Sequence, residues 1–122
     1  MNSPRVLIAD DEPELRQLFA EALGESGIPV RTAVSGGQAL EILKKNPGIE
    51  VLLSDIRMPG MDGYTLASES LTVRPELKIL LMTGFELRTP PELLIAREIK
   101  TLHKPISVGR LCELISGMLE RP

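Results

Sequence analysis

The chain of 122 residues is long enough for one hydrophobic core and too short to divide comfortably into two domains. Its composition, 43% hydrophobic and 25% charged, is that of an ordinary globular protein, and its net charge of -3 gives no attraction to nucleic acid. A single cysteine excludes an internal disulfide, and no apolar run approaches the ~20 residues that span a bilayer, so we expect a cytoplasmic protein without a membrane partner.

The chain begins with a short strand pattern followed by a helix pattern. Residues 5–9 form an apolar, β-branched run that ends at acids, which predicts a buried strand. Apolar residues at i, i+3, i+4, i+7 and i+8 follow over residues 15–23 and predict a helix. Gly24 and Gly27 are the expected stop signals for this helix.

A second strand and helix come next, and a third strand follows them. The strand is expected at residues 29–33. Ser35 and Gln38 form a capping-box pattern at the start of a helix that ends within residues 44–48. Residues 51–54 are the third apolar run, and they predict a third buried strand.

The same alternation continues to the end of the chain. A helix is expected at residues 64–71 and a strand at residues 77–82. Residues 89–96 then predict a fourth helix, because Thr-Pro-Pro-Glu supplies a cap, a proline at the first helical position and an acid that completes the box. Residues 100–103 predict a fifth strand, and the apolar face of residues 108–119 predicts a last helix.

Five strands that alternate with five helices predict parallel strands joined by right-handed crossovers, with helices on both faces of the sheet. The expected fold class is therefore α/β, an open doubly wound five-stranded parallel sheet in a three-layer sandwich. We expect a single domain over residues 1–122. In such folds, ligands bind beyond the carboxyl ends of the strands.

Charged and hydroxyl side chains follow the predicted strands. Asp10 and Asp11 follow the first strand, Asp55 the third, Thr83 the fourth and Lys104 the fifth. Three converging carboxylates repel one another, so we expect them to bind a cation. Oxygen ligands without cysteine or histidine favour a hard ion, Mg²⁺ with Mn²⁺ as an alternative.

A metal, an ammonium and a hydroxyl around a carboxylate can stabilise the charge that develops during in-line phosphoryl transfer. Asp55 is the expected acceptor, because carboxylates are nucleophiles toward phosphorus. It leads into residues 56–63, IRMPGMDG, whose proline and glycines fix the backbone tightly enough to aim a main-chain carbonyl at the metal. Flavin binding is not expected, because the Asp-Asp-Glu sequence after the first strand would repel its phosphate.

Four motifs of the chain, taken in order, resemble the receiver domain of two-component response regulators, the chemotaxis-type receiver fold. They are VLIADDE, LLSDIRMPGMDG, ILLMTG and LHKPIS, and the resemblance covers essentially the whole chain. The resemblance implies the strand order 2-1-3-4-5 and an aspartyl phosphate on Asp55, donated by a histidine kinase or a phosphotransfer protein. It implies self-catalysed phosphoryl transfer and slow autodephosphorylation rather than a classical enzyme.

The resemblance also implies the roles of the site residues. Asp11, Asp55 and the main-chain carbonyl of Arg57 would hold Mg²⁺ directly, and Asp10 would act through a metal-bound water. Thr83 and Lys104 would contact the phosphoryl oxygens, and the peptide bond between Lys104 and Pro105 would be cis.

The chain departs from the family pattern at Thr101. Receivers usually carry Phe or Tyr three residues before the lysine, and that ring takes part in the switch. Two alternatives therefore stay open: a scaffold whose interactions do not depend on phosphorylation, and the receiver part of a longer kinase or transcription regulator. The donor kinase, the output partner and the oligomeric state are not specified by these motifs.

Overall fold

The computed structural model describes residues 3–84, 92, 97 and 99–120. Their five parallel strands form one sheet of order β2-β1-β3-β4-β5, so the predicted fold class and strand order are confirmed. In chain order the elements are β1 (Val6–Ala9), α1 (Pro13–Glu25), β2 (Val30–Ala33), α2 (Gly36–Lys45), β3 (Val51–Asp55), α3 (Gly63–Val73), β4 (Lys78–Thr83), β5 (Lys100–His103) and α5 (Val108–Glu120).

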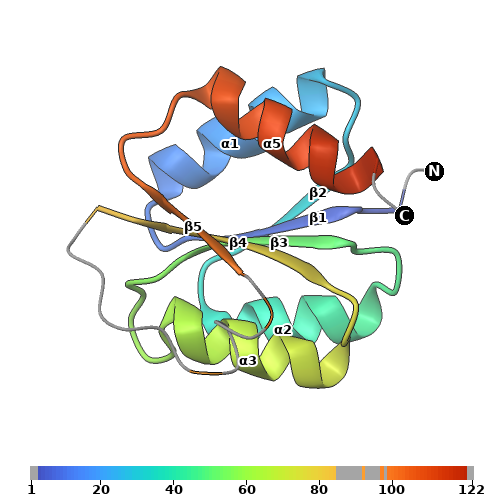
Figure 1. Cartoon of the computed structure of the whole chain (residues 1–122), viewed down its shortest axis with the longest axis vertical. Coiled ribbons are helices and arrows are strands. Elements are labelled where there is room, and N and C mark those ends of the chain that lie inside the picture. The colour runs from blue at the N-terminus through green and yellow to red at the C-terminus, as the bar shows by residue number, and fades with distance from the viewer. Residues whose placement is uncertain (1–2, 85–91, 93–96, 98, 121–122) are drawn as a thin grey trace.

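Four of the five predicted helices lie in the described part of the chain. The predicted fourth helix, residues 89–96, falls outside the described residues except for Glu92. Figure 1 shows α1 and α5 over one face of the sheet and α2 and α3 over the other, which is the expected three-layer arrangement.

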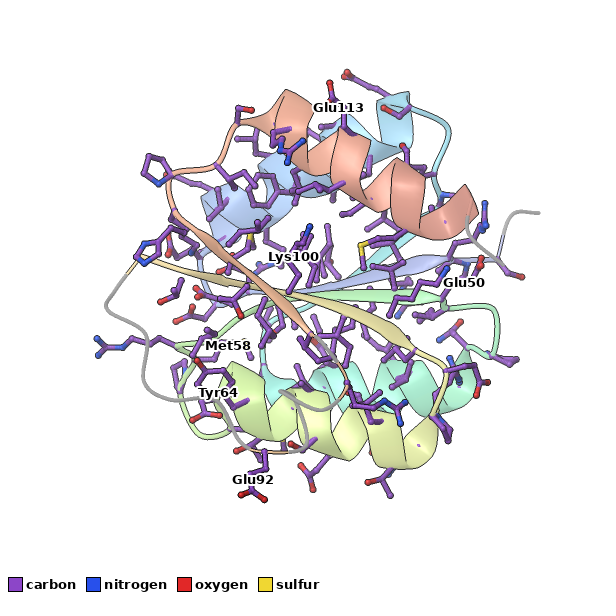
Figure 2. The ribbon with its side chains drawn as sticks, in the orientation of Figure 1. Glu50, Met58, Tyr64, Glu92, Lys100 and Glu113 are labelled. Carbon is purple, nitrogen blue, oxygen red and sulfur yellow. The ribbon has the colours of Figure 1, made fainter. Side chains whose placement is uncertain are left out.

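Each layer of helices closes its own hydrophobic core. Successive side chains of a strand point to opposite faces, so Leu7 and Ala9 join the core under α2 and α3 while Val6 and Ile8 join the core under α1 and α5. Met58 and Tyr64, labelled in Figure 2, extend the first of these cores beside α3. All four strand residues are fully buried, which explains the continuous apolar run in the sequence.

The start of α1 lies next to the predicted site. Pro13 is at the first helical position and Glu12 is the N-cap residue. The predicted stop at Gly24 is wrong, because the helix continues through this residue to Glu25. A glycine inside a helix costs only about 1 kcal/mol, whereas Gly27 has a φ of +83° that other residues rarely adopt.

The caps of α2 and α3 come from side chains at their N-termini. The Ser35 hydroxyl accepts a hydrogen bond of 3.2 Å from the backbone N–H of Gln38. In a standard capping box, the Gln38 side chain would accept from the N–H of the cap residue Ser35. Here it accepts from the N–H of Val34, one residue earlier. Asp62 caps α3 by accepting from the N–H of Thr65.

Two strands extend one residue beyond their predicted ends. Asp55 is the last residue of β3 and Thr83 the last residue of β4, although the apolar runs stop before them. Backbone pairing continues past both runs, since Ile56 donates to the carbonyl of Met82 and Lys104 donates to the carbonyl of Thr83. Asp55 and Thr83 therefore have backbone positions set by the sheet rather than by a loop.

Within the described ranges, no helix is both long enough and apolar enough to cross a lipid bilayer.

Candidate functional site

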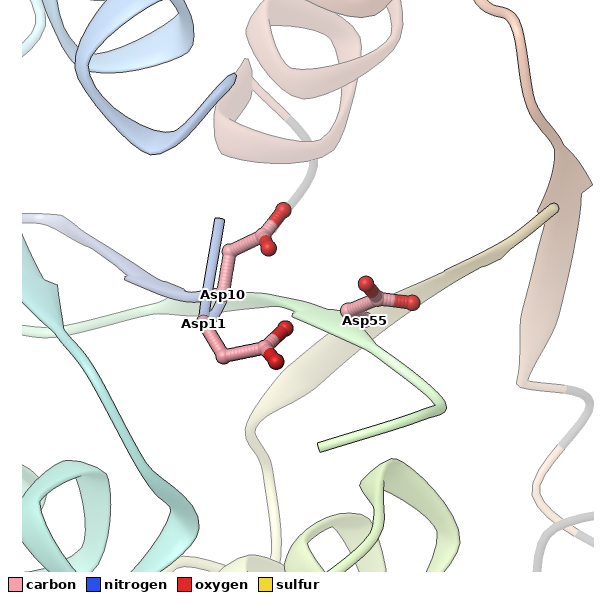
Figure 3. Close-up of side chains that lie close together, drawn as sticks. All are labelled: Asp10, Asp11 and Asp55. Carbon is pink, nitrogen blue, oxygen red and sulfur yellow. The ribbon is translucent and has the colours of Figure 1, made fainter. Parts of the chain in front are cut away.

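Three aspartates meet where β1 and β3 end. The parallel register pairs Ala9 with Ser54, which places Asp10 level with Asp55 on the neighbouring strand. Asp11 follows in the turn before α1, and the three residues each offer a carboxylate oxygen within 4.8 Å of the other two. Figure 3 shows the three side chains lying close together.

Asp10 is fully buried, and this burial conflicts with its charge. Its Oδ1 accepts a hydrogen bond of 2.9 Å from the backbone N–H of Glu12. Its Oδ2 is buried without a hydrogen-bond partner among the described residues. Desolvation raises the pKa of Asp10 from 3.8 to about 6, with a further contribution from the charge of Asp55. A cation next to this carboxylate would therefore favour its charged form.

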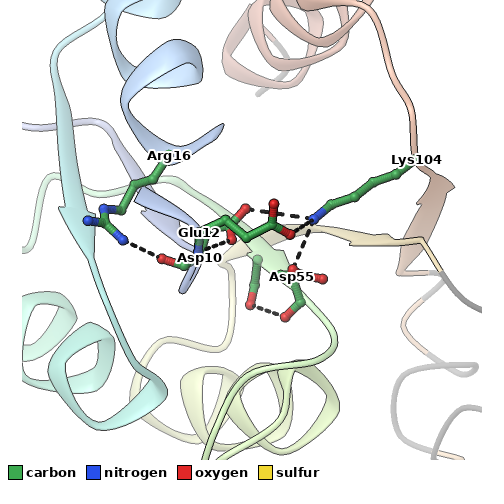
Figure 4. Close-up of polar contacts among 6 residues, drawn as sticks. Asp10, Glu12, Arg16, Asp55 and Lys104 are labelled. Carbon is green, nitrogen blue, oxygen red and sulfur yellow. Dashed lines mark hydrogen bonds and ion pairs between the residues drawn. The ribbon is translucent and has the colours of Figure 1, made fainter. Parts of the chain in front are cut away.

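Lys104 lies across the site from these aspartates. Its Nζ is 3.0 Å from Asp55 Oδ2, 3.3 Å from Glu12 Oε1 and 4.0 Å from Asp10 Oδ2 (Figure 4). Burial alone would lower the pKa of Lys104, but its hydrogen bond to Asp55 and the charge of Asp10 outweigh this effect and raise it. Lys104 is therefore a permanent cation shared by several carboxylates.

Strand pairing holds Lys104 and Thr83 side by side. His103 lies opposite Thr83 in the β4–β5 register, and the backbone N–H of Lys104 donates to the Thr83 carbonyl at 2.7 Å. The peptide bond between Lys104 and Pro105 is cis. Thr83 is buried and ends the strand next to β3, so its side chain comes from the same edge of the sheet as that of Asp55.

The loop after Asp55 packs tightly against the strand end. Gly60 has a φ of +81°, and the backbone N–H of Gly63 donates to the carbonyl of Ile56 at 2.7 Å. A Cβ atom at Gly63 would lie 2.4 Å from the carbonyl oxygen of Asp55, which no side chain can occupy. Only glycine permits this approach, and α3 therefore starts directly against the backbone of Asp55.

Comparison with known proteins agrees with this geometry. A sequence profile described as the response regulator receiver domain matches residues 6–116. The chain belongs to the response regulator receiver family. It is 36% identical over 116 residues to the response regulator receiver protein CpdR of Brucella abortus (strain 2308), a match that covers 94% of this chain and 96% of that protein.

Two further matches are to part of a larger protein and to a solved chain that this one covers almost entirely. It is 34% identical over 121 residues to the sensor kinase CckA of Brucella abortus, covering 98% of this chain but only 13% of the kinase. A solved structure of response regulator TrrA from Thermotoga maritima, in complex with Mg²⁺-BeF, superposes with a TM-score of 0.81 at 29% identity. That match covers 94% of this chain and 98% of the other.

The residues of this receiver fit a hard divalent cation. The three converging donors are all carboxylate oxygens, and one of the buried oxygens, Asp10 Oδ2, has no hydrogen-bond partner in the described part of the chain. A cation would satisfy this oxygen and offset the desolvation and the repulsion by Asp55 that together raise the pKa of Asp10. Arg57, the fourth predicted contributor, lies exposed two residues after Asp55.

The structure adds two residues to the site that the sequence motifs did not assign. Arg16 Nη1 donates to the carbonyl of Asp10 at 2.8 Å and supports the turn before α1. Glu12 contacts Lys104. The run Asp-Asp-Glu could have drawn attention to Glu12, but no sequence signal connects it with a lysine 92 positions later. Thr101, the atypical position, lies half-buried on β5 opposite Leu81.

Proposed function

We propose that this receiver takes a phosphoryl group from a histidine kinase or a phosphotransfer protein onto Asp55, and that the added charge switches the binding of an output partner. The observation that carries the proposal is the environment of Asp55. The residue is only 5% exposed, and its carboxylate lies 3.0 Å from Lys104 Nζ and close to the carboxylates of Asp10 and Asp11. The expected location is the cytoplasm, where such kinases would meet it.

Asp11, Asp55 and the main-chain carbonyl of Arg57 would hold Mg²⁺ directly, with Asp10 acting through a water, and Mn²⁺ could replace it. When bound, the ion neutralises charge on the phosphoryl oxygens. The buried oxygen of Asp10 without a hydrogen-bond partner supports this assignment within the described residues. The Mg²⁺-BeF complex of TrrA, 29% identical to this chain, adds support by similarity.

The transfer would be a displacement at phosphorus. A carboxylate oxygen of Asp55 forms the bond to phosphorus while the bond from phosphorus to the imidazole nitrogen of the donor breaks, and that nitrogen keeps the electron pair. Lys104 and the Thr83 hydroxyl would bind the phosphoryl oxygens. In a separate, slow step, water attacks the phosphorus while the bond from phosphorus to the Asp55 oxygen breaks, so that inorganic phosphate leaves and the Asp55 carboxylate is regenerated. The chain would promote both steps on itself without being a classical enzyme.

Intact mass spectrometry tests the acceptor. Incubation with a small phosphodonor such as acetyl phosphate and Mg²⁺ should add one phosphoryl group to the wild-type chain and none to Asp55→Asn. Asparagine keeps the size of the side chain but lacks the nucleophilic carboxylate oxygen. Modification of the variant to the same extent would contradict the assignment of Asp55.

A second candidate, a scaffold whose partner binding does not depend on phosphate, is favoured by one observation. Thr101 occupies the half-buried β5 position where an aromatic ring is usual, so this position has no ring to rearrange. The two functions differ in one measurement. Amide NMR signals of residues 85–101 should shift when Mg²⁺ and fluoroberyllate are added to a switch, and they should stay unchanged in a scaffold.

A further inference from the structure

Glu12 makes an interaction that its place in the chain does not require. It is the N-cap residue of α1, yet its side chain makes no capping hydrogen bond. Its Oε1 instead lies 3.3 Å from Lys104 Nζ, which comes 92 residues later. The Glu12 side chain is 62% exposed and that of Lys104 is 16% exposed. The contact therefore joins an exposed acid to a lysine that is mostly buried.

Lys104 is shared between Glu12 and Asp55. Its Nζ lies 3.0 Å from Asp55 Oδ2, and Figure 4 shows both contacts converging on the same nitrogen. A phosphoryl group on Asp55 would remove the carboxylate charge and bring roughly two negative charges on its own oxygens. These oxygens would need the ammonium group that Glu12 also contacts. Glu12 would then attract Lys104 away from them.

We propose that Glu12 is a positioning residue that competes with the phosphoryl group for Lys104. Its negative charge would then weaken the contact between Lys104 and the phosphoryl oxygens on Asp55. The inference rests on the proposed phosphorylation of Asp55 and deepens it. Glu12 itself forms no bond to the phosphoryl group. It acts through Lys104, by dividing the ammonium between two anionic partners.

The charge of Glu12 also reaches the acidic side of the pocket. Its Oε1 lies 3.3 Å from Lys104 Nζ, and the same nitrogen lies 4.0 Å from Asp10 Oδ2, so the negative charge of Glu12 is close to the acids that would bind the cation. The same charge should therefore favour Mg²⁺ and disfavour the phosphoryl group. If Glu12 had a merely structural role, its substitution would weaken the binding of both ligands. Opposite effects on the two affinities are therefore the signature of this competition.

The experiment compares Glu12→Gln with Glu14→Gln in the full chain by isothermal titration calorimetry. Glutamine keeps the length of the side chain and an oxygen that can still accept from Lys104, but it removes the charge. Glu14 is an exposed acid in the first turn of α1 that is not among the ion-pair partners of Lys104 in the described part of the chain. It is therefore a matched control for charge alone.

We expect Glu12→Gln to bind fluoroberyllate, at saturating Mg²⁺, roughly threefold more tightly than the wild type, a size typical of one partly exposed charge. The same variant should bind Mg²⁺ alone about twofold more weakly. Both differences should shrink at high salt, because Glu12 is exposed and its charge is screened. Glu14→Gln should match the wild type in both titrations.

The outcomes separate this inference from the proposed function. A wild-type chain that binds no fluoroberyllate with Mg²⁺ would count against the proposed function itself. A wild-type chain that binds it, with a Glu12→Gln variant that binds equally or more weakly, would overturn only the competition for Lys104. Equal effects of Glu12→Gln and Glu14→Gln would also overturn it, because the effect would then be one of net charge.

Discussion

Asp10 is the residue at which burial and charge conflict most directly. Its side chain is fully buried, and the pKa of about 6 shows that the protein favours its protonated form over a wider range than an exposed aspartate. In the metal-free chain, stability from this group is therefore greatest below pH 4 and is lost as the pH rises to about 6. A bound cation would reverse this preference, because it needs the charged form.

The affinity for Mg²⁺ should consequently depend on pH. A proton on Asp10 competes with the ion, so the apparent affinity should fall about tenfold between pH 7 and pH 5 from this group alone. Calorimetry at several pH values measures this slope. The Asp10→Asn variant should bind more weakly and lose most of the pH dependence. A wild-type affinity that is constant from pH 7 to pH 5 would contradict the link between Asp10 and the metal.

At the scale of elements, the junction between β3 and α3 determines where Asp55 lies. β3 ends at Asp55 and α3 begins at Gly63, where the backbone of Asp55 and Ile56 leaves no room for a Cβ atom. The loop between them turns at Gly60, where φ is positive, and is closed by the hydrogen bond from Gly63 to Ile56. The start of the helix therefore packs directly against the end of the acceptor strand, and a change in either should disturb the site.

Gly63→Ala tests this junction. The added Cβ would lie 2.4 Å from the Asp55 carbonyl oxygen and 2.7 Å from Ile56 Cα, both of them backbone atoms that cannot turn aside. We expect a loss of about 1–3 kcal/mol in the free energy of unfolding, measured with urea, and slower phosphorylation of Asp55.

Gly37→Ala is the matched control for this substitution. Gly37 lies exposed in the first turn of α2, and an added Cβ meets nothing within 4 Å. Alanine should stabilise the helix there by up to ~1 kcal/mol. A Gly63→Ala variant as stable as Gly37→Ala would show that the close approach at the junction is not needed.

At the scale of the whole molecule, the site exists only when the sheet is complete. Its acids come from the ends of β1 and β3, and its lysine follows β5 at the edge of the sheet. The unfolded chain has no such arrangement, so an ion that binds the pocket must stabilise the folded state. Stability and metal binding are therefore coupled through the fold.

Magnesium should raise the melting temperature. At a concentration ten times the dissociation constant, binding contributes about 1.4 kcal/mol, which corresponds to a rise of roughly 5 °C for a chain of this size. Asp11→Asn should fold, because Asp11 is exposed, but it should lose most of this rise. Differential scanning calorimetry with and without Mg²⁺ gives both values. An unchanged wild-type transition at millimolar Mg²⁺ would contradict the proposed metal site.

Much of the fold could be predicted from local patterns. The runs at β1 and β3 identified buried strands, and the apolar face of α5 identified a helix, because spacing along the chain reports which side chains can share a face. The order of the acids, Thr83 and Lys104 at the strand ends also predicted the site. Parallel strands bring their carboxyl ends to one edge, so alternation predicts the layered parallel sheet, whereas the strand order came from the resemblance to the receiver family.

The sequence by itself therefore determined the sheet, its helical layers and the residues that gather at its carboxyl edge. Only the tertiary structure decided that α1 continues through Gly24, that Asp10 has a buried oxygen without a hydrogen-bond partner in the described residues, and that Glu12 shares Lys104 with Asp55. These features depend on burial and on contacts between segments far apart in the chain. Local periodicity carries no information about either, because distance in space is set by packing.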